Sequence, residues 1–476
     1  MSTGTLAAAA VLAALVLAPA PSAAGVRPAY GGTVRIGVAA PPSVVPGAPS
    51  SADALIERAT SAPLLEVDGA GALVPGALAE VPVAEAGARA FRLRVRPGLT
   101  DASGRPLGAP DVAARLAALL APGPRSPDAW AALPVLGADA LLDGRAPLLA
   151  GVQVLSPSEL LVTLAFPLPE LPWLLASSAL ALPGAGPFTL APRRTPSDPV
   201  VLVHNDRHHR GRPYADELRL EVTDARTASR LLEQGRIQLV LRPEGAGPRA
   251  VALSPLTVTV AALQPSRLGP GAAAVRAALA AVDRGELARR FVRGPAEPMR
   301  TLVPPAILPG GAAEPAAPAG APPPARIALL ADAGEPDQRA LAERLQVKLF
   351  DRGVRASVEL VDSARHRARV AAGDYDVALV PVRVEALRPA LAAGQVAYAV
   401  RGAAAARRTL AALAGLEGDA AAAAAASAGR DLDLVPLVAT GLRATPAPAL
   451  QGATPRPDGG LDPGALWLLG VGGVTP

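Results

Sequence analysis

Short segments that alternate apolar and polar residues run through the first hundred positions of the chain, and this period of two is typical of strands with one buried face. Residues 33–38 have the pattern directly after two glycines, and residues 90–96 have it with three arginines on the polar face. The apolar spacing of residues 52–59 predicts a helix between them. Residues 111–120 predict another helix, because they follow Pro110 and begin with an acidic turn.

The later part of the chain alternates strand and helix patterns more regularly. Apolar runs at residues 326–330, 356–361 and 376–380 predict strands, and the amphipathic segment 337–350 predicts a helix between the first two. This order is typical of a parallel sheet covered by helices. The preceding segment 304–324 is rich in proline, glycine and alanine, so we expect a surface loop or linker there.

The N-terminus has the pattern of a secretory signal. Residues 6–18 form an apolar run without a charge, and the small residues Ser22, Ala23 and Ala24 follow it. The run is too short to cross a bilayer core of about 30 Å as a helix, so we expect cleavage after Ala24 and export to the periplasm. No basic residue precedes Arg27, so an uncleaved apolar tail is the alternative.

Composition narrows the classes of function. At 476 residues the chain exceeds one compact core, so two or more lobes are expected. The absence of cysteine excludes disulfides, thiolate zinc sites and a lipid-modified cysteine, so we expect the mature chain to be free in the periplasm. The net charge of +5 arises from 46 basic and 41 acidic residues without a basic cluster interleaved with aromatics, which disfavours nucleic-acid binding.

About ten short motifs follow one another from residue 31 to residue 468. They are GGTVRI at 31–36, PLLEVD at 63–68, LVPGALAE at 73–80, FRLRVRPG at 91–98, DASGRPL at 101–107 with APDV at 109–112, GAGPF at 184–188, Asn205 with GRPYAD at 211–216, VRAAL at 275–279 with Asp283-Arg284, GDYD at 373–376 and VPL at 435–437. In this order they resemble family 5 of the extracellular solute-binding proteins, the dipeptide-, oligopeptide- and nickel-binding components of ABC importers.

The resemblance implies an α/β protein with the two-lobed periplasmic binding protein fold (type II), each lobe a mixed sheet flanked by helices. It divides the chain into a signal peptide (1–24), a first lobe (25–265, to which 435–476 return) and a second lobe (266–434). It also implies the periplasmic solute-binding component of an ABC-type importer, a monomer without cofactors. Such a protein closes around a peptide-like or other small polar solute and delivers it to membrane permease subunits. The alternative is a binding-fold protein that has lost transport and acts as a sensor or assembly partner.

The candidate ligand-binding residues are Ser43, Gly186, Pro187, Phe188 and Arg383. The glycine-proline pair predicts a sharp turn, which either brings backbone to a ligand groove or closes a hairpin without touching a ligand. Arg383 lies just past the end of an expected parallel strand, where open α/β sheets place ligand contacts. It is interpreted as a partner for an anionic group, with a surface arginine as the alternative.

One part of the chain departs from the family. In members that carry peptides, an aspartate in a tryptophan- and proline-containing segment after the GDYD strand holds the ligand's ammonium group. Here the chain runs from Arg383 almost directly to Pro389 and an alanine-rich stretch that ends at Arg430, without an Asp-Pro-Asp motif or an aromatic wall. A buried ammonium group without a carboxylate partner costs several kcal/mol. We therefore expect a ligand that is neutral or anionic and is not a free peptide amine.

A rival chemistry comes from three histidines, His204, His208 and His209, which lie close to Asp206 and are here called the histidine cluster. Imidazole is the commonest ligand of zinc, copper and nickel in proteins. The flanking residues 200–203 predict a strand that runs into a loop, and neighbouring arginines add positive charge, so we expect no metal site. No HExxH, nucleophile elbow or phosphate-binding glycine loop occurs. The chain is therefore not expected to be an enzyme, and a metal-dependent hydrolase is the remaining alternative.

Overall fold

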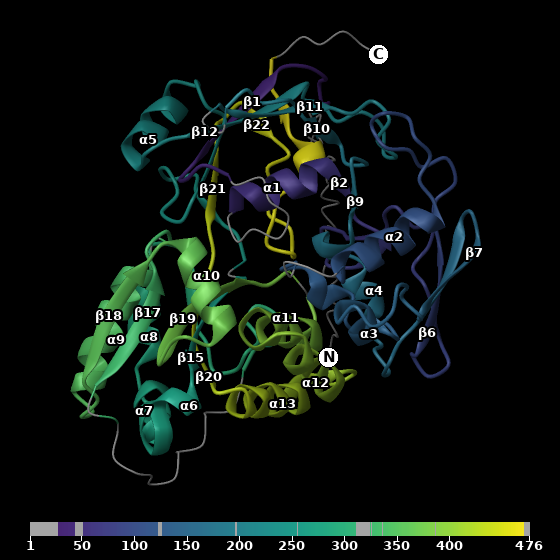
Figure 1. Cartoon of the computed structure of the whole chain (residues 1–476). Helices are drawn as coiled ribbons and strands as arrows, with labels where there is room; N and C mark the ends of the chain where they lie inside the picture. Colours follow the sequence, from purple (N-terminus) through teal and green to yellow (C-terminus); the bar gives the residue numbers. More distant parts are fainter. Residues whose placement is uncertain are drawn as a thin grey trace, which may run out of the picture.

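The computed structural model describes residues 27–42, 51–121, 126–195, 198–254, 256–310, 324, 326–335, 337–385 and 387–470. The expected signal peptide, Ser43 and most of the expected loop at 304–324 lie outside these residues. Figure 1 shows three groups of elements: one at the top, a second at the right and a third at the lower left. In the described ranges, no helix combines the length and the apolar character needed to cross a bilayer.

The first lobe, at the top of Figure 1, contains a seven-stranded sheet in the order β10-β11-β12-β1-β13-β21-β14. Strand β1 is central and pairs in parallel with β12 and β13, as its two-sided burial requires. Helix α1 follows it. The strands and helices of this lobe are β1 (Thr33–Val38), α1 (Ser51–Thr60), β10 (Phe188–Leu190), β11 (Val200–His204), β12 (Glu217–Val222), α5 (Ala225–Glu233), β13 (Leu239–Arg242), β14 (Val251–Ala252) and β21 (Arg443–Pro446).

A small-sheet subdomain occupies the right of Figure 1 and has the strand order β5-β6-β8-β7. In β6 the apolar Phe91 and Leu93 are buried, whereas the side chains of Arg92 and Arg94 are about half exposed, as the alternation predicts. Its elements are β5 (Ala84–Glu85), β6 (Ala90–Arg94), α2 (Ala109–Leu119), η1 (Ala129–Ala131), α3 (Ala138–Leu142), β7 (Val152–Ser156), β8 (Glu159–Thr163), α4 (Leu171–Leu174) and η2 (Ser178–Leu180).

The second lobe is built on a six-stranded sheet in the order β16-β20-β15-β19-β17-β18. Strand β17 pairs in parallel with β18 and β19, which confirms the expected parallel series, and β15 runs antiparallel to β19 and β20. Its strands are β15 (Thr257–Leu263), β16 (Ala296–Pro298), β17 (Ile327–Asp332), β18 (Ala356–Val361), β19 (Val377–Arg383) and β20 (Leu434–Thr440). Its helices are α6 (Pro265–Leu268), η3 (Gly269–Gly271), α7 (Ala272–Ala280), α8 (Arg284–Arg290), α9 (Gln338–Phe350), α10 (Ser363–Ala372), α11 (Pro389–Arg401), α12 (Ala403–Leu413) and α13 (Gly418–Asp431).

Three two-stranded ladders and a short helix complete the described elements. They are β2 (Ser61–Ala62) with β9 (Leu182–Pro183), β3 (Leu65–Val67) with β4 (Leu73–Pro75), β22 (Leu450–Gln451) with β23 (Trp467–Leu468), and η4 (Pro463–Ala465). Helix η4 packs against α1 and brings the C-terminal segment to the centre of the molecule.

The strand order differs from the expectation at the crossings between the lobes. Residues 435–437 were expected to return the chain to the first lobe, but they lie in β20, inside the six-stranded sheet. Strand β15 also lies in that sheet, although a boundary at residue 265 would place it in the first lobe. The return to the seven-stranded sheet is made by β21. The proposed two-lobe division stays a prediction, and these strands favour crossings near residues 253–257 and 440–443.

The buried apolar side chains divide unevenly among the lobes. One cluster fills the first lobe and includes Phe188, and a second lies on one face of the six-stranded sheet, under α7 and α9. The largest cluster is shared: it joins the small-sheet subdomain to α11, α12 and α13 of the second lobe. The two halves of the molecule are therefore in apolar contact on one side.

Candidate functional site

Two cavities lie between the lobes: the first where both lobes meet the small-sheet subdomain, and the second between the first and second lobes alone. The first has a volume of about 340 Å³ and the second about 280 Å³. Both are lined by Arg58, Glu385, Asp458 and Leu461, so they adjoin across these four residues. The second is bordered by the end of β1 in the first lobe and by Pro381 and Arg383 of β19 in the second lobe. This position between lobes is where the expected fold binds its ligand.

Three carboxylates, one from each part of the molecule, lie around one guanidinium at this junction. Glu57 is on α1 of the first lobe, Asp128 precedes η1 of the small-sheet subdomain, and Glu385 follows β19 of the second lobe. We call them the carboxylate cluster. Arg383 donates a hydrogen bond to Glu385, and its Nη2 lies 3.4 Å from Oε2 of Glu57.

Ser178 connects the small-sheet subdomain to this cluster. Its hydroxyl Oγ lies 2.5 Å from Oε2 of Glu385, and its backbone N–H donates to the same oxygen at 3.2 Å. On the second lobe, the backbone N–H of Glu385 donates to Oε1 of Gln395 at 3.2 Å. Glu385 is thus held by groups from both sides of the junction.

Burial and mutual repulsion perturb the three carboxylates unequally. Burial raises the pKa of Glu57 to about 7, with Glu385 and Asp128 adding to the rise and Arg383 opposing it. Burial, followed by the charge of Glu385, also raises the pKa of Asp128 to about 6. The pKa of Glu385 is lowered, because the contacts with Arg383 and Ser178 outweigh its burial. Glu385 is therefore the most acidic of the three, and Glu57 is the member poised to exchange a proton at neutral pH.

The charges around the junction do not balance. The three acids of the carboxylate cluster face two guanidinium groups, Arg115 and Arg383, because Arg58 and Arg456 are both paired with Asp458. Oδ2 of the buried Asp128 has no hydrogen-bond partner among the described residues. One acid of the cluster therefore has no guanidinium partner, and one proton or one cation can neutralise its charge.

Aromatic side chains line the first cavity. Tyr30 and Tyr214 pack with ring centroids 5.2 Å apart, and Trp173 lies on the small-sheet side. The guanidinium of Arg388 stacks over Trp173 at 4.2 Å from the ring centroid. Other parts of the chain therefore supply the aromatic side chains that the segment after Arg383 does not. These three residues are far from Arg383 in the sequence, and only the fold brings them to the cavity.

The expected ligand-binding residues have different positions. Arg383 lines the second cavity, as expected for a residue at the end of β19, but it is paired with two carboxylates and is not available to an anionic ligand. Pro187 lines the first cavity. Phe188 is fully buried in the core of the first lobe. Ser43 lies outside the described residues.

Gly186 closes a turn against the end of α1 and does not line either cavity. A Cβ atom at this position would lie 2.4 Å from the carbonyl oxygen of Ala59 and 2.5 Å from the backbone nitrogen of Ser61. Its own carbonyl accepts a hydrogen bond from Nδ2 of Asn205 at 2.8 Å. Only glycine fits so close to the neighbouring backbone. The turn joins β9 and β10, which pair with β2 and β11 and not with each other, so it closes no hairpin.

The expectation that no carboxylate follows Arg383 at the site is wrong. Glu385 is two residues beyond Arg383 and lines both cavities. The rule that selects Arg383, a position just past the carboxyl end of a parallel strand, applies equally to Glu385. Glu57 and Asp128 carry no comparable signal, because their approach to Glu385 depends on how the three parts of the molecule pack.

The histidine cluster is arranged by ordinary packing. Nδ1 of His204 and Nδ1 of His208 lie 3.1 Å and 3.0 Å from the carbonyl oxygens of Asp216 and Ala185. Burial lowers the pKa of His209 to about 3, with the charges of His208 and Arg210 adding to the fall, so this ring is neutral. Across the ranges that the structure describes, no group of three or more histidine, cysteine, aspartate or glutamate side chains could hold a metal ion.

Comparison with known proteins gives one family and a consistent set of folds. The model of the bacterial extracellular solute-binding proteins, family 5 Middle, matches residues 73–386, which is well over half of the chain. No curated protein matches the chain.

Solved structures agree over nearly the whole length. The murein tripeptide binding protein MppA of Escherichia coli is 18% identical with a TM-score of 0.73, and the match covers 92% of this chain and 98% of MppA. Against the unliganded open form of MppA the identity is 17%, the TM-score is 0.61 and the coverage is 92% and 97%. Haemophilus influenzae OppA in complex with the peptide RPPGFSPFR is 16% identical with a TM-score of 0.73, covering 92% and 99%. AgaA from A. tumefaciens R10 in complex with agropinic acid is 19% identical with a TM-score of 0.71, covering 92% and 99%. At these identities the likeness establishes the fold, a type II periplasmic binding protein.

Proposed function

Because the chain belongs to the bacterial extracellular solute-binding proteins, family 5, we propose that it is the periplasmic solute-binding component of an ABC-type importer. It would bind a solute between its lobes and deliver it to permease subunits in the membrane. The two adjoining cavities at the junction of the lobes support this role. A protein of this kind binds its solute and does not transform it, so we propose no catalytic residue.

The observation that carries the proposal further is the carboxylate excess at the junction. A solute with a positively charged nitrogen would take the place of the proton on Glu57 and offset the repulsion among the three carboxylates. Glu385 is the natural primary partner, because its lowered pKa keeps it ionised and Ser178 and Arg383 fix its position. The same excess of carboxylates disfavours anionic solutes, although Arg383 taken alone suggests a site for them.

Size and surroundings restrict the solute. The first cavity of about 340 Å³ suits a small molecule or a short peptide, and its aromatic side chains give apolar surface beside the charges. Among the similar structures, OppA is in complex with a nonapeptide and AgaA with agropinic acid, so the fold itself does not choose between these classes. We propose a small amine or guanidinium compound, short peptides included.

Native mass spectrometry of mature protein purified without refolding is the first experiment, since a retained solute would reveal its own mass. The second is a thermal-shift screen after solute removal, with di- to pentapeptides, the same peptides N-acetylated, arginine, polyamines and dicarboxylates. A solute at one hundred times its dissociation constant stabilises the folded protein by about 2.7 kcal/mol. We expect free amines and guanidinium compounds to raise the midpoint, whereas acetylated peptides and dicarboxylates should not.

The site assignment has a matched control. Glu335 lines the second cavity and also has a pKa raised by burial, followed by repulsion from Asp332, but it is not part of the carboxylate cluster. Glu385→Gln should abolish the response to cationic solutes, and Glu335→Gln should retain it. Equal responses in the two variants would exclude Glu385 as the ligand partner. A screen in which no solute shifts the midpoint would instead favour the non-transport alternative.

A further inference from the structure

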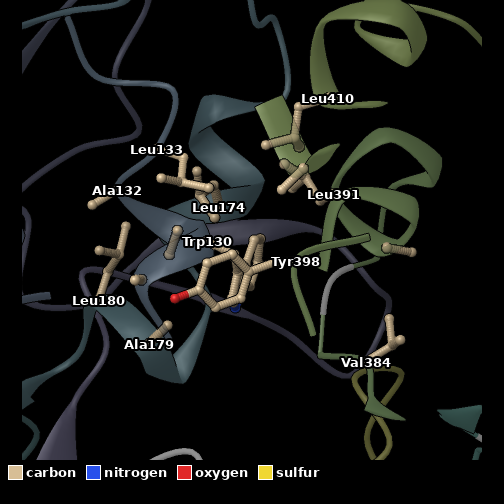
Figure 2. Close-up of a cluster of buried hydrophobic side chains, with 14 of the residues drawn as sticks. Trp130, Ala132, Leu133, Leu174, Ala179, Leu180, Val384, Leu391, Tyr398 and Leu410 are labelled. Atoms are coloured by element: carbon tan, nitrogen blue, oxygen red, sulfur yellow. The ribbon is translucent and has the colours of Figure 1, made fainter. Parts of the chain in front are cut away.

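The small-sheet subdomain and the second lobe meet in an apolar seam beside the two cavities. From the small-sheet side it contains the fully buried Trp130 and Leu133, and from the second lobe it contains Leu391 and Tyr398 of α11. Figure 2 shows the two sets facing each other, with the ring of Tyr398 directed away from its own helices and toward the segment that carries Ala179. Helix α11 packs directly against η1. The seam therefore buries large side chains from both sides.

Polar contacts cross the seam at four further places. The hydroxyl of Tyr398 donates to the backbone oxygen of Ser126 at 2.8 Å. The backbone N–H of Gly415, which follows α12, donates to Oε1 of Glu170 at 2.6 Å. Two other crossings are the ion pair of Arg407 with Asp139 and the stacking of Arg388 over Trp173. None of these contacts involves a residue of the carboxylate cluster.

A lobe rotation that opens the cavities on this side would expose the seam to water. A hundredfold preference for the closed form requires about 2.7 kcal/mol. At about 25 cal/mol per Å², exposure of about 110 Å² of apolar surface on opening supplies this free energy, which is less than the roughly 150–250 Å² that a single large aromatic side chain buries on folding. The seam contains two such side chains and several leucines. Its contacts are thus sufficient to hold the lobes together without help from a solute.

We propose that this seam keeps the protein closed when no solute is bound, so that opening of the seam precedes solute binding and limits its rate. The contacts across the seam are made by protein side chains and backbone alone. The fold matches peptide-bound OppA with a TM-score of 0.73 but the open form of MppA with 0.61. The proposal goes beyond the binding role, since it concerns the resting state of the lobes and does not depend on which solute binds.

Distance measurement between two spin labels tests the proposal without a known solute. Because the chain has no cysteine, Arg145→Cys and Arg408→Cys place labels only at two exposed positions that face each other across the seam, on the small-sheet subdomain and on α12. The protein is unfolded in guanidinium, dialysed to remove solute and refolded. We expect a single short distance in the protein refolded and measured at pH 5, unchanged from that in the protein as purified. A long or bimodal distance in the refolded protein would overturn the proposal.

Seam variants give the second arm of the experiment. Leu391→Ala should add a longer distance with at least a tenfold larger open fraction. Tyr398→Phe, which removes the hydroxyl and its contact with Ser126 but keeps the ring, should increase the open fraction by a smaller factor. Leu345→Ala is the matched control, because Leu345 is equally buried but belongs to the cluster on the other face of the six-stranded sheet. Folding of each variant is checked by circular dichroism. If Tyr398→Phe and a folded Leu391→Ala both stay as closed as Leu345→Ala, the seam is not what holds the lobes.

Discussion

The raised pKa of Glu57 gives the sharpest prediction about this protein. Burial and repulsion from Glu385 and Asp128 raise the pKa of Glu57 from its ordinary 4.5 to about 7. The folded protein therefore keeps a proton on Glu57 that the unfolded chain releases between about pH 4.5 and 7. The contribution to stability is fully present below this window and is lost as the pH rises through it. The Glu57 contribution therefore falls between pH 5 and pH 8. His209, whose pKa is lowered to about 3 from 6.5, contributes in the opposite sense up to about pH 6.5, so the effect of Glu57 is measured as the difference between the wild type and Glu57→Gln.

The magnitude follows from the two pKa values. A tenfold difference in proton affinity between the folded and unfolded states corresponds to about 1.4 kcal/mol, and integration between pH 5 and pH 8 gives a loss of roughly 2 to 3 kcal/mol from Glu57. For a protein of this size, an unfolding entropy of about 2.1 cal/mol/K per residue converts this loss to a fall of about 3 °C in the thermal midpoint. Asp128 adds to the fall in a lower window, because its pKa is raised to about 6 from 3.8.

Glu57→Gln isolates the effect, because glutamine imitates the protonated form at every pH. The variant should match the wild type at pH 5 and exceed its stability at pH 8 by roughly 2 kcal/mol. Calorimetry of solute-free protein at both pH values measures the difference, with Glu85→Gln as a control at an exposed glutamate on β5. A Glu57→Gln variant whose stability changes between pH 5 and pH 8 by the same amount as that of the wild type would refute the electrostatic description of the junction.

Three more predictions follow from the same residues and from the leader. Arg383→Ala should destabilise the protein by about 3–5 kcal/mol at pH 8, because the substitution leaves buried carboxylates without their partner. Arg94→Ala, at an exposed position, should cost less than about 1 kcal/mol. Chemical denaturation measures the free energy of unfolding of both variants. Replacement of the whole histidine cluster by alanine should leave the thermal midpoint insensitive to chelators, and a stoichiometric metal in the wild type that is lost in the variant would contradict this. N-terminal sequencing of periplasmic protein should begin at or near Gly25, and an intact Met1 in the cytoplasm would exclude processing.

The sequence predicts a strand or helix well where one face of the element is buried and the other is exposed, because the residue pattern then marks both faces. Strand β6 shows this well, since its alternating arginines mark the exposed face in the sequence and in the structure. The regular series from β17 to β19 is likewise visible as apolar runs separated by a helix pattern. Strands β15 and β20 are different, because both are buried on nearly every side and cross between lobes. Periodicity cannot say to which sheet such a strand belongs, since that depends on its hydrogen-bonded neighbours.

The candidate site was predictable only where it lies at the end of a strand. Arg383 and Glu385 both lie at the carboxyl end of β19, where open α/β sheets place ligand contacts. Arg383 alone suggests an anionic ligand, whereas the pair together with its neighbours favours a cationic one. Glu57 is an ordinary charged residue of a short amphipathic helix, and Asp128 lies near a turn that the sequence does not distinguish. Their raised pKa values come from burial against each other. That property depends on all three parts of the molecule together and has no local signature.

The seam and the surroundings of the carboxylate cluster share three stretches of chain. Asp128 lies two residues from Trp130, Ser178 precedes Ala179, and Val384 precedes Glu385. Each stretch thus gives one residue to the cluster or to its hydrogen bonds and a near neighbour to the seam. Burial is the largest cause of the raised pKa values of Glu57 and Asp128, and the seam lies directly beside Asp128 and Glu385.

Opening the seam would hydrate the cluster and return these pKa values toward their ordinary range. Closure and proton uptake are therefore linked, and the linkage is reciprocal. Between about pH 4.5 and 7, each increase of one pH unit should shift the lobes toward the open form by up to tenfold, unless a cationic solute replaces the proton. Such a solute would keep the protein closed at the pH at which the solute-free form is most inclined to open. The spin-label distance of the solute-free protein, measured from pH 5 to pH 8, should then lengthen with pH in the wild type and stay constant in Glu57→Gln.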